Sequence, residues 1–460
     1  MKLILLSGGS GKRLWPLSND ARSKQFLKVL QNGQGEPVSM VQRVWGQLGA
    51  VGLAHSAIVA TSKSQVDMIQ SQLGPAVKLI VEPERRDTFP AIALAAAYLY
   101  SVEKTELDEV VAVLPVDPYV EAGFFNKVKE LETVLRTTQA NLALIGVTPT
   151  FPSEKYGYIV PEFKQDKQDK QPYSRVSHFR EKPTQAVAKE LIQQRGLWNC
   201  GIFAFKLGFL ISQLDELGIP TQYEELLQNY GALPKISFDY EVVEKAKHLV
   251  VLRYDGAWKD LGTWNTLTEE MPNVMVGLGI ISEDSCNTHV INELDIPVAV
   301  LGLSNAVVVV SPDGVLVSDK DSSPMVKDLV GKFDRRPMFE EKRWGWYRVL
   351  DHTVFVGEKE VLTKRLGVLA GKNLSYQEHK KRSEVWTIIS GEGELALDGI
   401  VHRVRPGDVW NIPIGAKHGL RASTDLELIE VQMGSNLVEE DIIRIFMTWE
   451  EVEQHCRWVN

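Results

Sequence analysis

Cysteine is scarce in this chain of 460 residues, and long apolar runs are absent. The three cysteines, Cys200, Cys286 and Cys456, lie far apart and are odd in number, so we expect no disulfide framework and a reducing compartment. No apolar run is long enough to span a bilayer, and the first residues lack the layout of a signal peptide. We therefore expect a cytoplasmic protein that is not bound to a membrane.

The chain also lacks an excess of positive charge. Its 51 Lys and Arg residues stand against 60 Asp and Glu residues, which gives a formal net charge of −9. This balance argues against broad nucleic-acid binding, although a local basic pocket remains compatible with it. A hydrophobic content of 44% and a charged content of 24% are ordinary for a globular protein, and the length allows two or three domains.

A glycine-rich loop follows the first apolar run. Residues 2–5 predict a buried strand, and the stretch LSGGSGKRLWP comes next at residues 6–16. Glycine lets the backbone approach a ligand, and successive loop amides form an anion-binding concavity. A glycine turn after a strand is often only a turn, but the cations Arg13 and Lys24 favour phosphate binding. The residues predicted to cradle phosphate are Gly8, Gly9, Ser10, Gly11 and Lys12.

The spacing of this loop excludes two common phosphate-binding motifs. A dinucleotide fingerprint beginning at Gly9 would need glycine in place of Leu14. A P-loop ending at Lys12 would need glycine at Leu6 and Ser or Thr at Arg13.

Residues up to about 267 alternate between short β-rich runs and helical patterns. Runs at 57–60, 110–114 and 142–147 predict strands, and residues 91–100 and 126–138 predict helices. The alternation predicts an α/β fold with a Rossmann-like, mixed or mainly parallel sheet covered on both faces. Ligands of such sheets bind at the carboxyl ends of the strands, where the loops of interest follow.

Acidic and basic residues lie directly after several predicted strands. Glu82 and Arg86 precede a helix whose N-terminus could face a phosphate or nucleotide, although Arg86 could also be a solvated loop charge. Asp117 could hold Mg²⁺ against phosphates, although an Asp there is equally suited to a turn or cap. Asp260 stands beside a second glycine turn. Two carboxylates meeting over one phosphate cradle are what a magnesium site requires.

The residue pattern changes after residue 283, where helical periodicity gives way to short β-rich runs. Short β-rich runs at 297–301, 306–310 and 314–317 predict a small β linker module, and a charged stretch at 331–342 marks a boundary. From residue 344, short strands with Gly-rich turns predict a β-barrel of the jelly-roll type. We expect three domains, at 1–270, 280–335 and 340–460. Exposed apolar edges of the linker make a homo-oligomer plausible.

The last domain carries a candidate metal site. Gln377 and His379 can share one strand face, Glu384 follows a turn, and His418 comes later. Each alone is more often structural, but together they could hold Zn²⁺ with one open position.

The motifs of this chain resemble a known family in a specific order. GGSGKRLWP followed by SKQFL closely resembles the signature of sugar-1-phosphate nucleotidyltransferases, nearest the bacterial mannose-1-phosphate guanylyltransferases. This family includes long forms with a C-terminal cupin of the mannose-6-phosphate isomerase type, and the resemblance covers nearly the whole chain. It implies that Asp117 and Asp260 bind Mg²⁺, and that Glu82 and Arg86 lie on the nucleotide side. Asp87, Phe89 and Pro118 depart from the family motifs.

The resemblance extends to the sugar side of the site. Gly157 matches a sugar-binding turn, Glu181 and Lys182 match a Glu-Lys-Pro motif, and Asn199 matches a further sugar motif. These matches imply that Glu181 binds sugar hydroxyls and Lys182 the sugar phosphate. Cys200 departs from the motif, and we interpret it as a packing residue. The polar run at 164–171 predicts a solvated hairpin tip.

The resemblance implies a Mg²⁺-dependent enzyme that joins GTP and mannose 1-phosphate to give GDP-mannose and pyrophosphate. Arg13, Lys24, Asp117 and Asp260 would be its catalytic residues. A different hexose 1-phosphate is one alternative. Another is a bifunctional enzyme that also interconverts mannose 6-phosphate and fructose 6-phosphate. Isomerase activity is put in doubt because Lys381 stands where the family has a second His, and a Lys beside the metal would alter proton transfer. Two alternatives of other classes are a metal-dependent isomerase or epimerase whose N-terminal part only binds nucleotide, and a regulatory sugar-nucleotide sensor without turnover.

Overall fold

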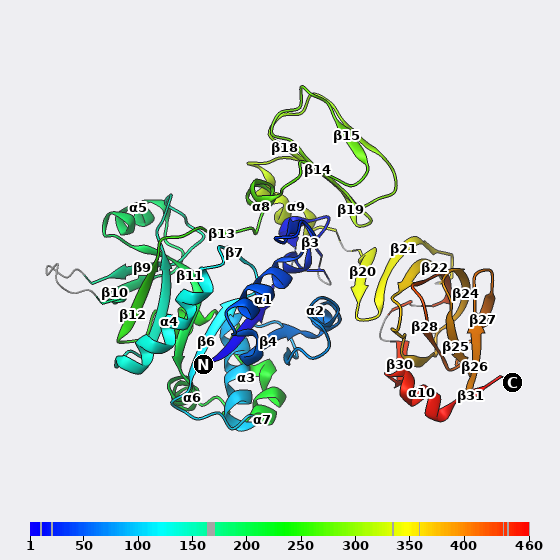
Figure 1. Ribbon diagram of the computed structural model, residues 1–460, viewed down its shortest axis with the longest axis horizontal. Helices are drawn as coiled ribbons and strands as arrows, with labels where there is room; N and C mark the ends of the chain where they lie inside the picture. Colours follow the sequence, from blue (N-terminus) through cyan, green and yellow to red (C-terminus); the bar gives the residue numbers. More distant parts are fainter. Residues whose placement is uncertain are drawn as a thin grey trace. The chain divides into compact units, whose positions relative to one another are not determined.

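The computed structural model describes residues 1–9, 12–19, 22–162, 171–333, 335–357, 359–435, 437–438 and 441–459. Ser10, Gly11 and residues 164–170 of the hairpin tip predicted at 164–171 lie outside the described residues. The chain divides into two compact units (Figure 1). The first comprises Met1–Leu14, Ser23–Val274 and Lys320–Val326, and the second comprises Trp15–Arg22, Met275–Asp319 and Lys327–Asn460.

A mixed sheet forms the centre of the first unit. Its described strands number nine, in the order β5-β4-β1-β6-β11-β8-β12-β10-β9. Strands β5, β4, β1 and β6 are mutually parallel, β11 runs antiparallel between β6 and β8, and β12 is parallel to β8. The bounds are β1 Lys2–Ser7, β4 Ala57–Ser62, β5 Leu79–Glu82, β6 Val110–Pro115, β8 Leu142–Val147, β9 Tyr158–Pro161, β10 Ser174–Arg180, β11 Leu197–Lys206 and β12 Leu249–Tyr254. The Rossmann-like α/β prediction is confirmed.

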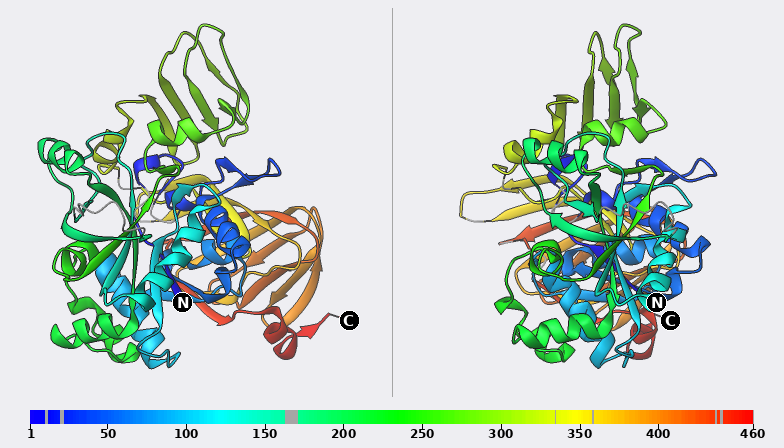
Figure 2. Two further views of the ribbon diagram at one scale, coloured as in Figure 1. Left: turned by 60° about the vertical axis from the view of Figure 1, so that its left-hand side comes forward. Right: turned by 90° about the vertical axis from the view of Figure 1, so that its left-hand side faces the viewer.

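Helices cover both faces of this sheet (Figures 1 and 2). Side chains of α1, α2, α4 and α5 pack in one apolar cluster, and those of α3, α6 and α7 pack in another. The helices are α1 Met40–Ala50, α2 Val66–Leu73, α3 Thr88–Ser101, α4 Phe124–Thr137, α5 Gln185–Gln193, α6 Leu207–Glu216, α7 Tyr223–Gln228 and α8 Trp264–Glu270. The helices predicted at 91–100 and 126–138 correspond to α3 and α4.

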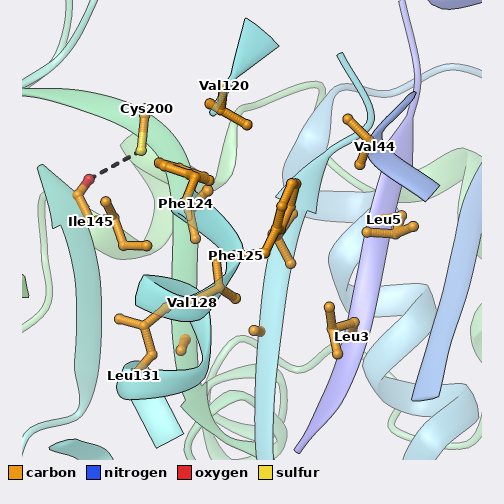
Figure 3. Packing of buried hydrophobic residues seen from close by; sticks show 14 of the residues in the cluster. Leu3, Leu5, Val44, Val120, Phe124, Phe125, Val128, Leu131, Ile145 and Cys200 are labelled. Atoms are coloured by element: carbon orange, nitrogen blue, oxygen red, sulfur yellow. Dashed lines mark hydrogen bonds between the residues drawn. The ribbon is translucent and has the colours of Figure 1, made fainter. Parts of the chain in front are cut away.

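The apolar runs are continuous because both faces of the sheet are buried. Along β1, Leu3 and Leu5 point into the cluster under α1 and α4, while Ile4 points into the opposite cluster. Figure 3 shows Phe125 of α4 on the side of Leu3 and Leu5 of β1, and Phe124 on the side of Ile145. The rigid sheet holds the strand ends, and so the loops that follow them, at one edge.

A small ribbon lies beyond the sheet. β7 (Pro118–Val120) pairs antiparallel with β13 (Trp258–Asp260), and the register sets Asp260 opposite Pro118. The two predicted metal-binding carboxylates are therefore brought together by backbone pairing.

The β linker predicted at 280–335 is composed of strands. β14 (Met275–Val276), β16 (His289–Asn292) and β18 (Ala306–Ser311) pair in parallel, and β19 (Gly314–Asp319) closes antiparallel. β15 (Gly279–Ile281) pairs in parallel with β17 (Val298–Val300). Short helix α9 (Val326–Val330) follows.

The segment Trp15–Arg22 belongs with this module rather than with the glycine loop that precedes it. Ser311 Oγ donates to the Pro16 carbonyl at 3.0 Å, and Asn19 Nδ2 donates to Asp313 Oδ2 at 2.9 Å. The conspicuous motif at residues 6–16 is thus divided between the two units.

The last part of the chain forms two antiparallel sheets, as the jelly-roll prediction requires. Across the described residues each sheet has six strands, in the orders β20-β21-β22-β29-β24-β27 and β30-β23-β28-β25-β26-β31, where the β26–β31 pair is parallel. The bounds are β20 Phe339–Lys342, β21 Gly345–Val354, β22 Glu360–Val368, β23 Tyr376–His379, β24 Arg382–Ser390, β25 Gly393–Leu397, β26 Ile400–Val404, β27 Val409–Ile412, β28 His418–Ala422, β29 Leu426–Gly434, β30 Ile442–Phe446 and β31 Arg457–Trp458, with α10 at Trp449–His455. Among the described helices, none is long and apolar enough to cross a membrane.

Candidate functional site

The glycine loop begins where β1 ends. Gly9 has a φ of 127°, a conformation that a side chain would strain, and its carbonyl accepts a hydrogen bond from Ser23 Oγ at 3.0 Å. Lys12 and Arg13 follow in a short 3-10 helix, where Lys12 is partly exposed and Arg13 is exposed. Ser10 and Gly11, assigned to the same cradle, lie outside the described residues.

Lys24, Asp117 and Asp260 converge on one point from three distant segments. Lys24 Nζ lies 2.7 Å from Asp117 Oδ2 and 3.0 Å from Asp260 Oδ1. Their side chains keep between 22% and 34% of their surface exposed, so a ligand from solvent can reach them. Asp117 directly precedes β7 and Asp260 ends β13, so the pairing of these strands brings the two carboxylates together. Lys24 begins the short helix that follows Ser23.

The electrostatics of this cluster favour the charged forms of Lys24 and Asp260. Burial alone would lower the pKa of Lys24, but the charges of Asp117 and Asp260 outweigh it and raise that pKa above the ordinary lysine value. Burial would raise the pKa of Asp260, but Lys24 and, more weakly, Arg13 hold it below the ordinary aspartate value. Hard carboxylate oxygens facing a common point fit the donor set that Mg²⁺ uses beside substrate phosphates.

A second cluster contains all four residues assigned to the sugar. Asn199 N donates to the Gly157 carbonyl at 2.8 Å, and Lys182 Nζ lies 3.2 Å from Glu181 Oε1. A Cβ on Gly157 would overlap Glu181 Oε2 and come within 2.9 Å of the Phe179 ring. Glycine is therefore required here by close approach.

Glu181 is a buried carboxylate with spare hydrogen-bonding capacity. Its side chain is 7% exposed, and its Oε2 has no hydrogen-bond partner among the described residues. Burial, and then the neighbouring Asp239, raise the pKa of Glu181 to about 7, while Lys182 partly opposes this. A buried carboxylate oxygen without a partner is suited to accept a hydrogen bond from a ligand hydroxyl.

Asp239 was missed as a site residue by the sequence prediction. Asn199 Nδ2 donates to Asp239 Oδ1 at 2.7 Å, and burial raises the pKa of Asp239. It opens the π-helical turn Asp239–Val243, within a stretch that resembles the family's Asp-Tyr-x-x-Met-Glu-Lys segment. That resemblance was the available signal, but the contact with Asn199 joins residues 40 positions apart.

Of the two residues predicted to lie on the nucleotide side, Glu82 ends β5 and is buried. Tyr230, which the sequence prediction missed, donates its hydroxyl to Glu82 Oε2 at 2.7 Å. Arg86 is half-buried, donates to the Leu233 carbonyl and pairs with Glu84 at 3.0 Å. Arg86 is therefore not a simple solvated charge. It ties the loop after β5 to residues 230–233.

Cys200 packs as expected. It is buried, its Sγ donates to the Ile145 carbonyl at 3.2 Å (Figure 3), and burial raises its pKa to about 12. A thiol in this state is neither a nucleophile nor a metal ligand at neutral pH.

The second unit holds a cluster suited to a metal ion. Ligand atoms of His379, Glu384 and His418 lie within 4.8 Å of one another, and all three residues are buried. His379 ends β23, Glu384 lies near the start of β24, and His418 begins β28. Gln377 joins them, since its Nε2 position lies 3.2 Å from His379 Nε2.

The protonation states in this cluster suit metal binding. The His418 Nδ1 position lies 3.0 Å from the Ala416 carbonyl, while its buried Nε2 has no hydrogen-bond partner in the described part of the chain. Burial lowers the pKa of His379 to about 4, so its imidazole is neutral at pH 7, as a metal ligand must be. The cluster of two imidazoles and one carboxylate thus fits a divalent transition metal.

Lys381, which the sequence analysis expects beside the metal, lies outside the buried part of this cluster. Lys381 is exposed on the turn between β23 and β24, where its backbone N donates to Asp441 Oδ2 at 3.1 Å. The neighbouring cation is Arg382, which is buried and places Nε 3.0 Å from Glu384 Oε1. The turn explains the difference, because Lys381 lies outside both strands whereas Arg382 begins β24.

A mixed α/β sheet with a lysine between two carboxylates, followed by a double-sheet domain with a His-Glu-His cluster, defines a nucleotidyltransferase joined to a cupin-type isomerase domain. The nucleotidyl transferase family model matches residues 2–275, and the mannose-6-phosphate isomerase C-terminal model matches residues 337–446. The chain belongs to the nucleotidyl transferase family and, within it, to the bacterial mannose-1-phosphate guanylyltransferases that carry this C-terminal domain, which are enzymes.

Relatives match over nearly their whole length. The mannose-1-phosphate guanylyltransferase of Salmonella muenchen is 30% identical, with 96% of this chain and 97% of the relative covered. The alginate biosynthesis protein AlgA of Pseudomonas putida is 33% identical, with 96% and 94% covered. A crystal structure named mannose-1-phosphate geranyltransferase, from Thermus thermophilus, superposes with a TM-score of 0.60 at 29% identity and covers 72% of this chain and 98% of that one.

Proposed function

We propose that the protein forms GDP-mannose and pyrophosphate from GTP and α-D-mannose 1-phosphate, with Mg²⁺. The observation that carries this proposal is the meeting of Lys24 with Asp117 and Asp260 beyond the end of β6. The names of the full-length relatives supply the choice of mannose and guanine, and the alginate and xanthan proteins among them connect it with polysaccharide synthesis. Cytoplasmic location and a homo-oligomer stay predictions from the sequence.

The reaction brings two negatively charged substrates together. A phosphate oxygen of the sugar attacks the α-phosphorus of GTP in line, and pyrophosphate leaves. Both reactants are anionic, so the main tasks are to align them and to neutralise their charge. No covalent enzyme intermediate is needed, as in other phosphoryl transfers. The backbone of Gly8 and Gly9, with Lys12, Arg13 and Lys24, would stabilise the triphosphate.

Asp117 and Asp260 would hold the magnesium ion, which supplies positive charge to the substrate phosphates when it is bound. The ammonium group of Lys24 lies between the two carboxylates. Its side chain is long enough to direct one ammonium hydrogen to a phosphate while another keeps a contact with an aspartate. Its raised pKa keeps it cationic throughout the working pH range.

The sugar would lie over Gly157. Lys182 would bind its phosphate, and Glu181 and Asn199 would accept and donate hydrogen bonds to its hydroxyls. The free Oε2 of Glu181 supports this assignment, and Asp239 would fix the Asn199 amide. Glu82 and Arg86 would form the nucleotide side.

One panel of substrates tests the reaction. Purified protein is incubated with Mg²⁺, each of GTP, ATP, UTP and dTTP, and mannose, glucose or galactose 1-phosphate, and pyrophosphate release is measured. We expect release with GTP and mannose 1-phosphate above all other pairs. Preference for another hexose 1-phosphate would replace the substrate assignment, and no release with any pair would leave a binding protein instead of a transferase.

Asp117→Asn tests the cluster. We expect turnover to fall by about 10²-fold or more, because a charge facing the reacting phosphates is removed while the side-chain shape is kept. Asp255→Asn is the matched control, since Asp255 is an exposed partner of Arg253. Normal turnover in folded Asp117→Asn, measured beside its thermal unfolding curve, would contradict the assignment.

A second activity is favoured by the buried His379, Glu384 and His418 cluster. Here the cupin domain would interconvert mannose 6-phosphate and fructose 6-phosphate with a bound divalent metal such as Zn²⁺. Lys381, which raised an objection in the sequence, is exposed and is not buried with these ligands. Formation of fructose 6-phosphate from mannose 6-phosphate, and its loss on chelation with recovery on adding metal, tests this activity.

A further inference from the structure

A buried polar network lies directly behind the glycine loop and Lys24. It comprises five side chains, each at most 2% exposed: Ser7, Ser23, Gln25, Thr61 and Gln65. None was assigned a role from the sequence. Buried amides and hydroxyls destabilise a fold unless they are hydrogen-bonded, so the partners of such a network are specific.

Gln65 is connected to the glycine loop through one hydroxyl. Gln65 Nε2 donates to Ser23 Oγ at 2.7 Å, and Ser23 Oγ donates to the Gly9 carbonyl at 3.0 Å. The single hydroxyl hydrogen of Ser23 is used by Gly9, and its lone pair is used by Gln65. The backbone of Gly9 is thereby tied to the residue that precedes α2.

The side-chain oxygen of Gln65 contacts residues of strands β1 and β4. Gln65 Oε1 lies 3.3 Å from Thr61 Oγ1 and 3.4 Å from Ser7 Oγ. Gln25 Nε2 donates to Ser7 Oγ at 3.2 Å and lies 3.5 Å from Gln65 Oε1. Ser23 and Gln25 flank Lys24, so the backbone on both sides of Lys24 is held by contacts that meet at Gln65.

We propose that Gln65 is a positioning residue for nucleotidyl transfer. Acting through Ser23 and Gln25, it holds the backbone of Gly9 and the backbone carrying Lys24 in one fixed relation, so that both reach the triphosphate together. The inference rests on the proposed function, in which the loop and Lys24 bind phosphate. Fixed geometry matters because small displacements of aligned groups lower the rate of such reactions strongly.

The test compares Gln65→Met and Ser23→Ala with the double variant in the full-length protein. Gln65→Met keeps the length of the side chain and removes its hydrogen bonds, and Ser23→Ala removes one hydroxyl. We expect each single variant to lower kcat for GDP-mannose formation by about 10-fold or more, with KM for mannose 1-phosphate changed by less than about twofold. We expect the double variant to lose little more than the worse single variant, since both act on one connection.

Ser39→Ala is the matched control. Ser39 is a fully buried serine in the same unit whose Oγ caps α1 and donates to Gln72 Oε1 at 2.6 Å. It should lower the melting temperature as Ser23→Ala does but leave kcat unchanged. A network with a merely structural role would instead lower stability in all variants without lowering kcat.

The outcomes separate the two claims. If the wild-type protein forms no GDP-mannose, the proposed function fails. If the wild type is active and folded Ser23→Ala keeps its full kcat, or if the losses of the two single variants multiply in the double variant, the positioning role is overturned. Ser23→Ala decides the question alone should Gln65→Met fail to fold.

Discussion

Burial of the Glu181 carboxylate couples the stability of the protein to pH. Its pKa of about 7 lies above the ordinary glutamate value, so the folded protein holds this proton more tightly than the unfolded chain does. The free energy of unfolding therefore falls as the pH rises from about 4.5 through 7, by an amount on the order of 3 kcal/mol.

Replacement of Glu181 by Gln tests this coupling. Relative to wild type, Glu181→Gln should gain stability between pH 5 and pH 8, because the glutamine does not ionise; urea unfolding at both pH values measures the gain. In wild type, KM for mannose 1-phosphate should fall between pH 6 and pH 8 as an accepting carboxylate forms, and Glu181→Gln should flatten that profile. Glu224→Gln on exposed α7 is the control. Equal pH profiles for wild type and Glu181→Gln would refute the assignment.

The absence of a side chain at Gly157 leaves the space that the Glu181 carboxylate occupies. Since a Cβ would overlap Glu181 Oε2, Gly157→Ala should displace that carboxylate and raise KM for mannose 1-phosphate by about 10-fold or more. Gly46→Ala in α1 is the control, because no heavy atom lies within 4 Å of its added Cβ. It should stabilise the protein by roughly 0.5–1 kcal/mol without changing KM. An unchanged KM in Gly157→Ala would exclude a sugar site over this glycine.

At the scale of elements, short pairings determine the site. β7 and β13 are each three residues long, yet their register sets Asp260 opposite Pro118, next to Asp117. Pro118 stands where the family has His, and its position in the ribbon is compatible with proline, which donates no ladder hydrogen bond. The strands and helices themselves were predictable, because periodicity and turn residues act locally.

The start of α1 provides a prediction at this scale. Ser39 and Gln42 form a reciprocal capping box, in which Ser39 Oγ accepts from Gln42 N and the Gln42 side chain accepts from Ser39 N. Ser39→Ala should lower the free energy of unfolding by about 1 kcal/mol, measured by urea denaturation. Ser174→Ala, at an exposed serine in β10, should change it by less than about 0.5 kcal/mol. Equal effects of the two variants would argue against the cap.

At the scale of the whole molecule, one chain carries two sites in two units. The cluster around Lys24 belongs to the first unit, and the His379, Glu384 and His418 cluster belongs to the second. The chemistry that each requires differs, because Mg²⁺ prefers oxygen ligands while two imidazoles select a softer metal.

Removal of the second metal site should therefore spare the first. The double variant His379→Ala/His418→Ala should lose its bound transition metal, measured by elemental analysis, and keep GDP-mannose formation within about twofold in excess Mg²⁺. His402→Ala is the control, since His402 packs against Trp410 outside the cluster and its replacement should retain metal. A loss of nucleotidyl transfer in the double variant would show that the sites are coupled.

The sequence by itself determined the fold classes and the glycine loop, and it proposed most residues of the candidate site. Strand and helix patterns, glycine turns and motif order all act between residues close in the chain. Only the tertiary structure decided which distant groups meet: Asp239 with Asn199, Tyr230 with Glu82, and Gln65 with Ser23. It also placed Lys381 on an exposed turn. These outcomes depend on strand register and on packing between layers, which no local pattern specifies.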